Sequence, residues 1–254
     1  MSKATSGSVS GELPGPVILS RIHEGLPTDT PWILRVVLRS RAFLVVALAV
    51  TLSLTIAALA NPEWLLRIDQ PLSDWVRGAD GQLWVAKAVT DLGSPTLAVA
   101  FGIVGVVFFW SRCRASAITL GALVASALAV DIVLKLIVDR PRPISPAVDT
   151  ALGSFPSGHV IHAVVIFGLV PFLLWVMTER RAFLRLGFGL FAVVTLSVAV
   201  SRVRLGAHWP SDVVTSLFIG ASLLLAAEQM IISSWAADRC VQLGHHERKE
   251  AAPE

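Results

Sequence analysis

Long apolar runs dominate the pattern along this chain. A helix needs about 20 mostly apolar residues to cross roughly 30 Å of hydrocarbon. No alternation of apolar and polar residues typical of membrane β-strands is visible, so the spans must satisfy their backbone groups as helices. The pattern therefore predicts an all-α fold, a bundle of six transmembrane helices. The expected spans are residues 42–60, 92–110, 115–138, 160–177, 186–200 and 213–237.

The composition agrees with a chain that lies in a bilayer. Of its 254 residues, 54% are hydrophobic and only 15% are charged, and the mean hydropathy is +0.71. A water-soluble core does not require so apolar a chain. Without an internal repeat or a long linker, we expect one six-span domain at residues 35–238. A flexible cytoplasmic tail at residues 1–34, rich in Gly and Pro, would precede it, and a second cytoplasmic tail at residues 239–254 would follow.

The basic residues of the short loops predict the orientation, because such loops stay preferentially in the cytoplasm. Arginines precede the first run, join the second to the third and join the fourth to the fifth: Arg35, Arg39, Arg41, Arg112, Arg114, Arg180, Arg181 and Arg185. We therefore expect both termini in the cytoplasm of a bacterial cell, whose plasma membrane also suits the richness in Ala, Val and Arg. Since these loops account for much of the net charge of +3, nucleic-acid binding is not expected.

The loop at residues 61–91 is expected to face outward. Trp64, Trp75 and Trp84 in this loop are predicted to lie at the membrane interface, where tryptophan is enriched. Arg204, near the end of the fifth run, could either bind a lipid head group or anchor its helix at the interface. The first run ends in Ala-Leu-Ala, which resembles a signal-peptide cleavage site, but its length and its long leader favour a retained anchor.

Three segments at the outward ends of the runs concentrate side chains suited to a phosphoryl group. Such a group needs several fixed donors around its oxygens, with a nucleophile and an acid on opposite sides. Arg142 and Arg202 offer paired donors, and Lys135 offers a point charge. The backbone amides of Ser157 and Gly158, at a predicted helix start, could also face an anion. The sequence thus predicts a phosphate site at the non-cytoplasmic face.

Two histidines and one carboxylate in these segments could carry the chemistry. His208 and Asp212 are four residues apart, so the carboxylate could hold one ring nitrogen and leave the other free to attack. His159 is then available as the acid. No acidic cluster able to hold magnesium is visible, and no cofactor is expected.

Some neighbouring side chains have a second interpretation. Lys135 and Asp131 could form only an intramembrane ion pair, or the pair could serve both purposes. Arg140 repeats the Arg-Pro pattern of Arg142 two residues earlier and is the alternative to it as the phosphate ligand. His162 lacks further metal ligands nearby and is expected to pack within the bundle.

Three motifs in this order resemble the phosphatidic acid phosphatase type 2 superfamily, which also includes bacterial acid phosphatases and vanadium haloperoxidases. The first is a lysine, six residues and Arg-Pro, the second is Pro-Ser-Gly-His, and the third is Ser-Arg, five residues, histidine, three residues and aspartate. Each is complete here: Lys135 with Arg142-Pro143, residues 156–159, and Ser201-Arg202 with His208 and Asp212. All three together, at one predicted membrane face, are a specific signal.

The resemblance implies a metal-independent lipid phosphatase that works in two steps. His208 would attack phosphorus with help from Asp212, and His159 would protonate the leaving oxygen and then activate water. The substrate would be a lipid phosphate or pyrophosphate, such as a polyprenyl pyrophosphate, phosphatidylglycerol phosphate or phosphatidate. A lipid phosphotransferase using the same phosphohistidine and a non-catalytic membrane scaffold or transporter remain as alternatives. The oligomeric state stays open.

Overall fold

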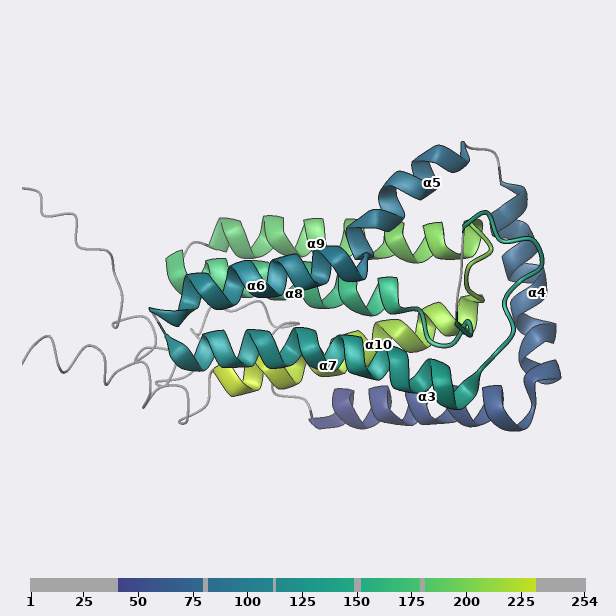
Figure 1. Cartoon of the computed structure of the whole chain (residues 1–254), viewed down its shortest axis with the longest axis horizontal. Coiled ribbons are helices and arrows are strands. Elements are labelled where there is room, and N and C mark those ends of the chain that lie inside the picture. Colours follow the sequence, from purple (N-terminus) through teal and green to yellow (C-terminus); the bar gives the residue numbers. More distant parts are fainter. Residues whose placement is uncertain (1–40, 80–81, 112, 149–151, 179–180, 232–254) are drawn as a thin grey trace, which may run out of the picture.

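The computed structural model describes residues 41–79, 82–111, 113–148, 152–178 and 181–231. Both expected tails lie outside these residues. The described part of the chain consists of helices, turns and bends, with no strand, so the all-α prediction is confirmed. Helices run along the long axis of the molecule (Figure 1). These are α3 (Arg41–Ala60), α6 (Pro95–Trp110), α7 (Arg114–Val138), α8 (Gly158–Thr178), α9 (Arg181–Arg204) and α10 (Pro210–Ile231).

Five segments of the described chain are long and apolar enough to cross a membrane: Ala42–Ala60, Leu83–Trp110, Arg114–Val138, Arg185–Arg204 and Pro210–Ile231. The fourth expected span, residues 160–177, lies within α8. The apolar helix found there, Gly158–Leu169, is shorter than the five segments. Large apolar side chains on α3 and α6 point away from the protein, as lipid-facing residues do. The chain is therefore an integral membrane protein.

Helix α8 lies in the centre of the bundle. It packs against α7, α9 and α10, and its side chains Ile161, Val164 and Leu169 are almost fully buried. Its partners contribute Leu120 from α7 and Leu224 from α10 to the same core. The Pro-Ser-Gly-His motif at the start of α8 is therefore carried by an element that the rest of the bundle encloses.

Residues 61–91, expected as an outward loop, instead form α4 (Pro62–Gly78), α5 (Leu83–Thr90) and the short 3-10 helix η1 (Asp91–Gly93). Asn61 begins α4, because its side chain accepts a hydrogen bond from the Trp64 amide at 3.1 Å and Pro62 occupies the first turn. Figure 1 shows α4 lying across one end of the bundle.

The two faces of α4 differ in character. Leu65, Asp69 and Ser73, spaced one helical turn apart, are buried toward the bundle. The exposed side carries the apolar residues Trp64, Ile68, Leu72 and Trp75. Such an amphipathic helix is suited to lie in the plane of the membrane interface. The interfacial position of its tryptophans stays a prediction.

The end of the bundle that α4 crosses gathers the three motif segments (Figure 1). Here α7 and α9 end and α8 and α10 begin, joined by residues 139–157 and 205–209. Helix α7 stops at Asp139, whose φ of 39° is left-handed and whose amide still bonds the Lys135 carbonyl at 3.0 Å. Gly206 supplies a second left-handed turn, with φ of 64°, just before His208. These turns bring segments distant in sequence to one site.

Candidate functional site

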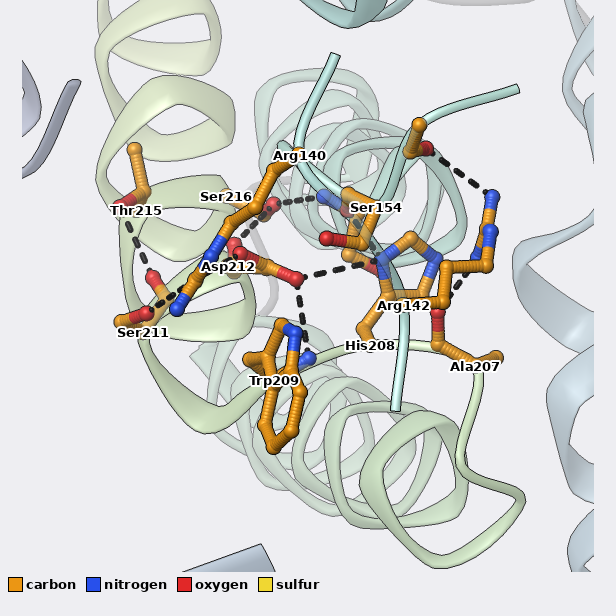
Figure 2. A network of polar contacts seen from close by, with 12 residues as sticks. Arg140, Arg142, Ser154, Ala207, His208, Trp209, Ser211, Asp212, Thr215 and Ser216 are labelled. Carbon is orange, nitrogen blue, oxygen red and sulfur yellow. Dashed lines mark hydrogen bonds and ion pairs between the residues drawn. The ribbon is translucent and has the colours of Figure 1, made fainter. Parts of the chain in front are cut away.

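The ring of His208 has a defined hydrogen-bond partner (Figure 2). Its Nδ1 lies 2.5 Å from the backbone oxygen of Ser154 and 3.8 Å from Oδ2 of Asp212. A carbonyl can only accept, so Nδ1 donates the hydrogen and Nε2 of the neutral ring carries the lone pair. The residue is only 1% exposed. This tautomer leaves Nε2 as the atom able to attack an electrophile.

Asp212 belongs to the start of α10 and is held from two sides. Trp209 precedes the helix, and its amide donates to Oδ2 of Asp212 at 2.9 Å, which is half of a capping box. Oδ1 of the same carboxylate accepts from Nη1 of Arg140 at 2.6 Å. The carboxylate therefore faces His208 from a fixed position, while Ser154 makes the closer contact with the ring.

Three cationic side chains surround the buried imidazole. Burial, followed by the charges of Arg202, Arg142 and Lys135, holds the pKa of His208 well below its ordinary value of 6.5. His208 is consequently neutral at physiological pH, the form that a nucleophile requires.

The titration of His208 can be observed directly. Because its pKa is lowered, the Cε1 signal of His208 is expected to show no titration as the pH falls from about 8 to 6. The unfolded chain binds this proton with the ordinary pKa of 6.5, so the stability due to the neutral ring should be lost as the pH falls below that value. Carbon-13 NMR of histidine-labelled protein in detergent would measure the titration of the ring, and the signal that disappears in His208→Asn would be that of His208. A midpoint near 6.5 would contradict the described environment.

Each predicted phosphate-binding cation has protein partners in this structure. Nη1 of Arg202 donates to the Thr90 hydroxyl at 3.0 Å, while its Nε is buried without a partner among the described residues. Lys135 pairs with Asp131 at 2.6 Å, so the expected ion pair is present. Arg142 donates to backbone oxygens, those of Leu152 and Gly153 at 3.0 Å and that of Ala207.

The Ser157-Gly158 backbone differs in part from the expectation. The Ser157 amide donates to Oγ of Ser216 at 2.7 Å and is therefore occupied. Its hydroxyl is buried without a partner in the described chain, so the side chain is the better candidate donor. A Cβ on Gly158 would lie 2.5 Å from Cγ of Asp131, so glycine is needed here for close packing between α8 and α7. His159, in the first turn of α8, lies within electrostatic reach of Arg202 and His208.

Four residues of this network were not predicted as site members: Asp69, Arg140, Ser154 and Ser211. The guanidinium of Arg140 bonds Asp212 and Asp69, and Arg142 stays the predicted phosphate ligand. A helical reading of residues 62–78 would have placed Asp69 on a buried face. The remaining contacts join positions 71 and 142 residues apart and have no local signal in the sequence.

The structure also shows the contacts of His162 and Arg204, whose roles have more than one interpretation in the sequence. His162 is buried and its Nδ1 lies 3.2 Å from the Gly93 oxygen, in agreement with a packed histidine. Arg204 donates to the Val76 oxygen of α4 at 2.9 Å, which ties α9 to that helix. No group of three or more His, Cys, Asp or Glu side chains in the described residues could hold a metal ion.

Comparison with known proteins shows what this region of the chain is similar to. Residues 115–235 match the model of the PAP2 superfamily. The chain is 27% identical over 145 residues to phosphatidylglycerophosphatase B of Bacillus subtilis (strain 168), covering 55% of this chain and 70% of that protein. It is 35% identical over 111 residues to decaprenylphosphoryl-5-phosphoribose phosphatase of Mycobacterium tuberculosis (strain H37Rv). That match covers 41% of this chain and about half, 53%, of the relative.

A solved structure shares the fold. The crystal structure of a transmembrane PAP2-type phosphatidylglycerolphosphate phosphatase from Bacillus subtilis matches with a TM-score of 0.66 at 22% identity, over 73% of this chain and 94% of that one. The region matched by the family model spans α7 to α10 and holds every motif residue from Lys135 to Asp212. Over residues 115–235, a little under half of its length, the chain is therefore similar to the PAP2 superfamily.

Proposed function

We propose that this protein is a membrane phosphatase that hydrolyses a lipid phosphate or pyrophosphate through a phosphohistidine. The observation that carries the proposal is His208, a neutral imidazole whose Nδ1 is bonded and whose Nε2 is left to attack beside three cations. Two relatives support the reaction class, since their names describe phosphatases of phosphatidylglycerophosphate and of decaprenylphosphoryl-5-phosphoribose.

In the first step, Nε2 of His208 forms a bond to phosphorus as the bond from phosphorus to the leaving oxygen breaks. His159, which takes up a proton as the anionic phosphate binds beside it, donates that proton to the leaving oxygen, which departs as the lipid alcohol or phosphate. The imidazole becomes cationic, and the carboxylate of Asp212 and the Ser154 oxygen stabilise it. The product of this step is a phosphohistidine.

In the second step, water attacks the phosphohistidine, and His159 accepts a proton from it because this side chain has just given one away. The bond between phosphorus and Nε2 breaks, which returns His208 to its neutral form. Lys135, Arg142 and Arg202 stabilise the charge on the peripheral oxygens in both steps. The Ser157 hydroxyl, unpartnered among the described residues, adds a neutral donor.

A lipid substrate fits the surroundings of the site. The bundle is embedded in the membrane, and α4 lies across the same end as His208 with its apolar side exposed. A helix that lies in the interface keeps the site at the depth of lipid head groups. By the distribution of basic loops, this end faces outward from a bacterial plasma membrane, with both termini in the cytoplasm.

The test is phosphate release from a panel of lipids by purified protein in detergent with EDTA. The panel contains a polyprenyl pyrophosphate, phosphatidylglycerol phosphate and phosphatidate, with His208→Ala protein as the blank. The wild-type protein is expected to release phosphate from at least one of them, and the rates of release rank the three classes of lipid. Running the reaction in ¹⁸O-labelled water should place one labelled oxygen in each released phosphate.

The same assay separates the alternatives. Transfer of phosphate to an added alcohol, with little labelled phosphate, would identify a phosphotransferase instead. No release and no transfer from any lipid, by protein that is folded, would overturn the phosphatase proposal and leave the non-catalytic scaffold.

A further inference from the structure

Arg140 is a buried cation that the proposed mechanism does not use. It is 2% exposed and lies on the segment that follows α7, two residues before Arg142. Its Nη1 donates to Oδ1 of Asp212 at 2.6 Å and to Oγ of Ser211 at 2.8 Å (Figure 2). Its guanidinium carbon lies 5.7 Å from the centre of the Trp209 ring. The side chain therefore bonds residues at the start of α10 and is not free to bind phosphate.

The other end of this guanidinium is anchored on α4. Nη2 of Arg140 donates to Oδ2 of Asp69 at 2.7 Å. Asp69 also accepts from the Ser211 amide at 2.8 Å and from the Ser211 hydroxyl at 2.6 Å. The carboxylate of Asp69 is itself 1% exposed. A helix outside the three motifs thus bonds both the arginine and the helix that carries Asp212.

We propose that Arg140, anchored by Asp69, is a positioning residue that holds Asp212 against His208 for the attack on phosphorus. This inference rests on the proposed phosphatase function. Asp212 contacts His208 only at 3.8 Å, so small movements of the carboxylate change the field at the ring. Arg140 and the Trp209 amide each bind one of its oxygens, which fixes both its position and its rotation.

The charges of the network suit a ring that becomes cationic. Two carboxylates and one guanidinium leave a net charge of about −1 beside a site that otherwise holds three cations. This excess negative charge stabilises the imidazolium that forms when Nε2 binds phosphorus. If Arg140 were absent, no cation would lie between the buried carboxylates of Asp69 and Asp212, and the two would repel each other.

The geometry requires arginine in particular. The planar guanidinium reaches Asp212 with one terminal nitrogen and Asp69 with the other. Lysine would retain the charge but has a single nitrogen and cannot hold both carboxylates in the same plane. Arg140→Lys is therefore a conservative variant that weakens positioning while it keeps a positive charge beside the two carboxylates.

The experiment compares Arg140→Lys with Arg142→Lys in the lipid phosphate assay, with orthovanadate as a probe of the phosphate site. Arg140→Lys is expected to lower kcat by about 10²-fold, while KM and the vanadate inhibition constant stay within about twofold. Arg142→Lys should raise KM and the vanadate constant, because that side chain is proposed to bind the phosphoryl group. Asp69→Asn should also lower kcat. In the double variant Asp69→Asn/Arg140→Lys, the fold-loss in kcat should be smaller than the product of the two single fold-losses.

The outcomes separate the two proposals. Wild-type kcat in Arg140→Lys, or KM and vanadate constants that rise as in Arg142→Lys, would overturn the positioning role while leaving the phosphatase intact. Independent effects of Asp69→Asn and Arg140→Lys would overturn the anchoring by α4. A folded wild-type protein without turnover would overturn the proposed function, and the inference that rests on it, at once. Thermal unfolding of each variant shows that the compared proteins are folded.

Discussion

Replacing His208 with alanine is expected to lower phosphate release by at least about 10³-fold while the helical bundle stays folded. The proposed nucleophile would be lost, and water would have to attack the lipid phosphate directly. The ring is fully buried, so its removal leaves a cavity, but it lies in the turn between α9 and α10, outside the apolar contacts that hold the helices together. Phosphate release and thermal unfolding of purified protein measure the two effects separately.

His208→Asn is the matched control for this prediction. Its amide can donate to the Ser154 oxygen as Nδ1 does, so it retains the local hydrogen bond but has no nucleophilic nitrogen. Both variants should be inactive, and both should fail to take up label from a substrate carrying radioactive phosphorus when the reaction is stopped in alkali. Turnover in either variant at a rate close to that of the wild type would exclude His208 as the nucleophile.

The meeting of the motif segments could be predicted from the sequence because it follows from topology alone. Spans that alternate in direction bring the end of one pair of helices to the start of another, and the described structure has this arrangement for Lys135, His159, Arg202 and His208. Amphipathic spacing could also have revealed α4, whose buried and exposed residues recur every three or four positions. The many charges in residues 61–91 favoured a loop instead.

The partner of the His208 ring could not be predicted from spacing. The four-residue separation from Asp212 indicates a direct contact only if both residues lie in one helix. Helix α10 begins at Pro210, so His208 precedes it and Asp212 turns back to the Trp209 amide. The space next to Nδ1 is filled by the Ser154 oxygen, which comes from a segment 54 residues away. Contacts of this kind depend on how loops pack, and no local pattern encodes them.

Replacing Gly158 with alanine is expected to reduce activity by about 10²-fold and to destabilise the protein by about 1–3 kcal/mol. The added methyl group would lie 2.5 Å from Cγ and 2.6 Å from Oδ1 of Asp131. That carboxylate is tied to Lys135 at 2.6 Å, so it cannot retreat without moving a cation proposed to bind phosphate. Steady-state kinetics and the unfolding midpoint would report the two effects.

Gly189→Ala is the matched control, because a methyl group there meets nothing within 4 Å and the residue lies in the interior of α9. This variant should keep wild-type activity and gain about 0.5–1 kcal/mol, the usual advantage of alanine over glycine within a helix. Adding Asp131→Ala to Gly158→Ala removes the overlap but leaves Lys135 without its partner, so the double variant should be more stable than the sum of the two single losses predicts. Activity should stay low, because Lys135 then lacks the partner that orients it. If Gly158→Ala behaved like Gly189→Ala in both measurements, the close packing of α8 against Asp131 could not be what holds Lys135 in place.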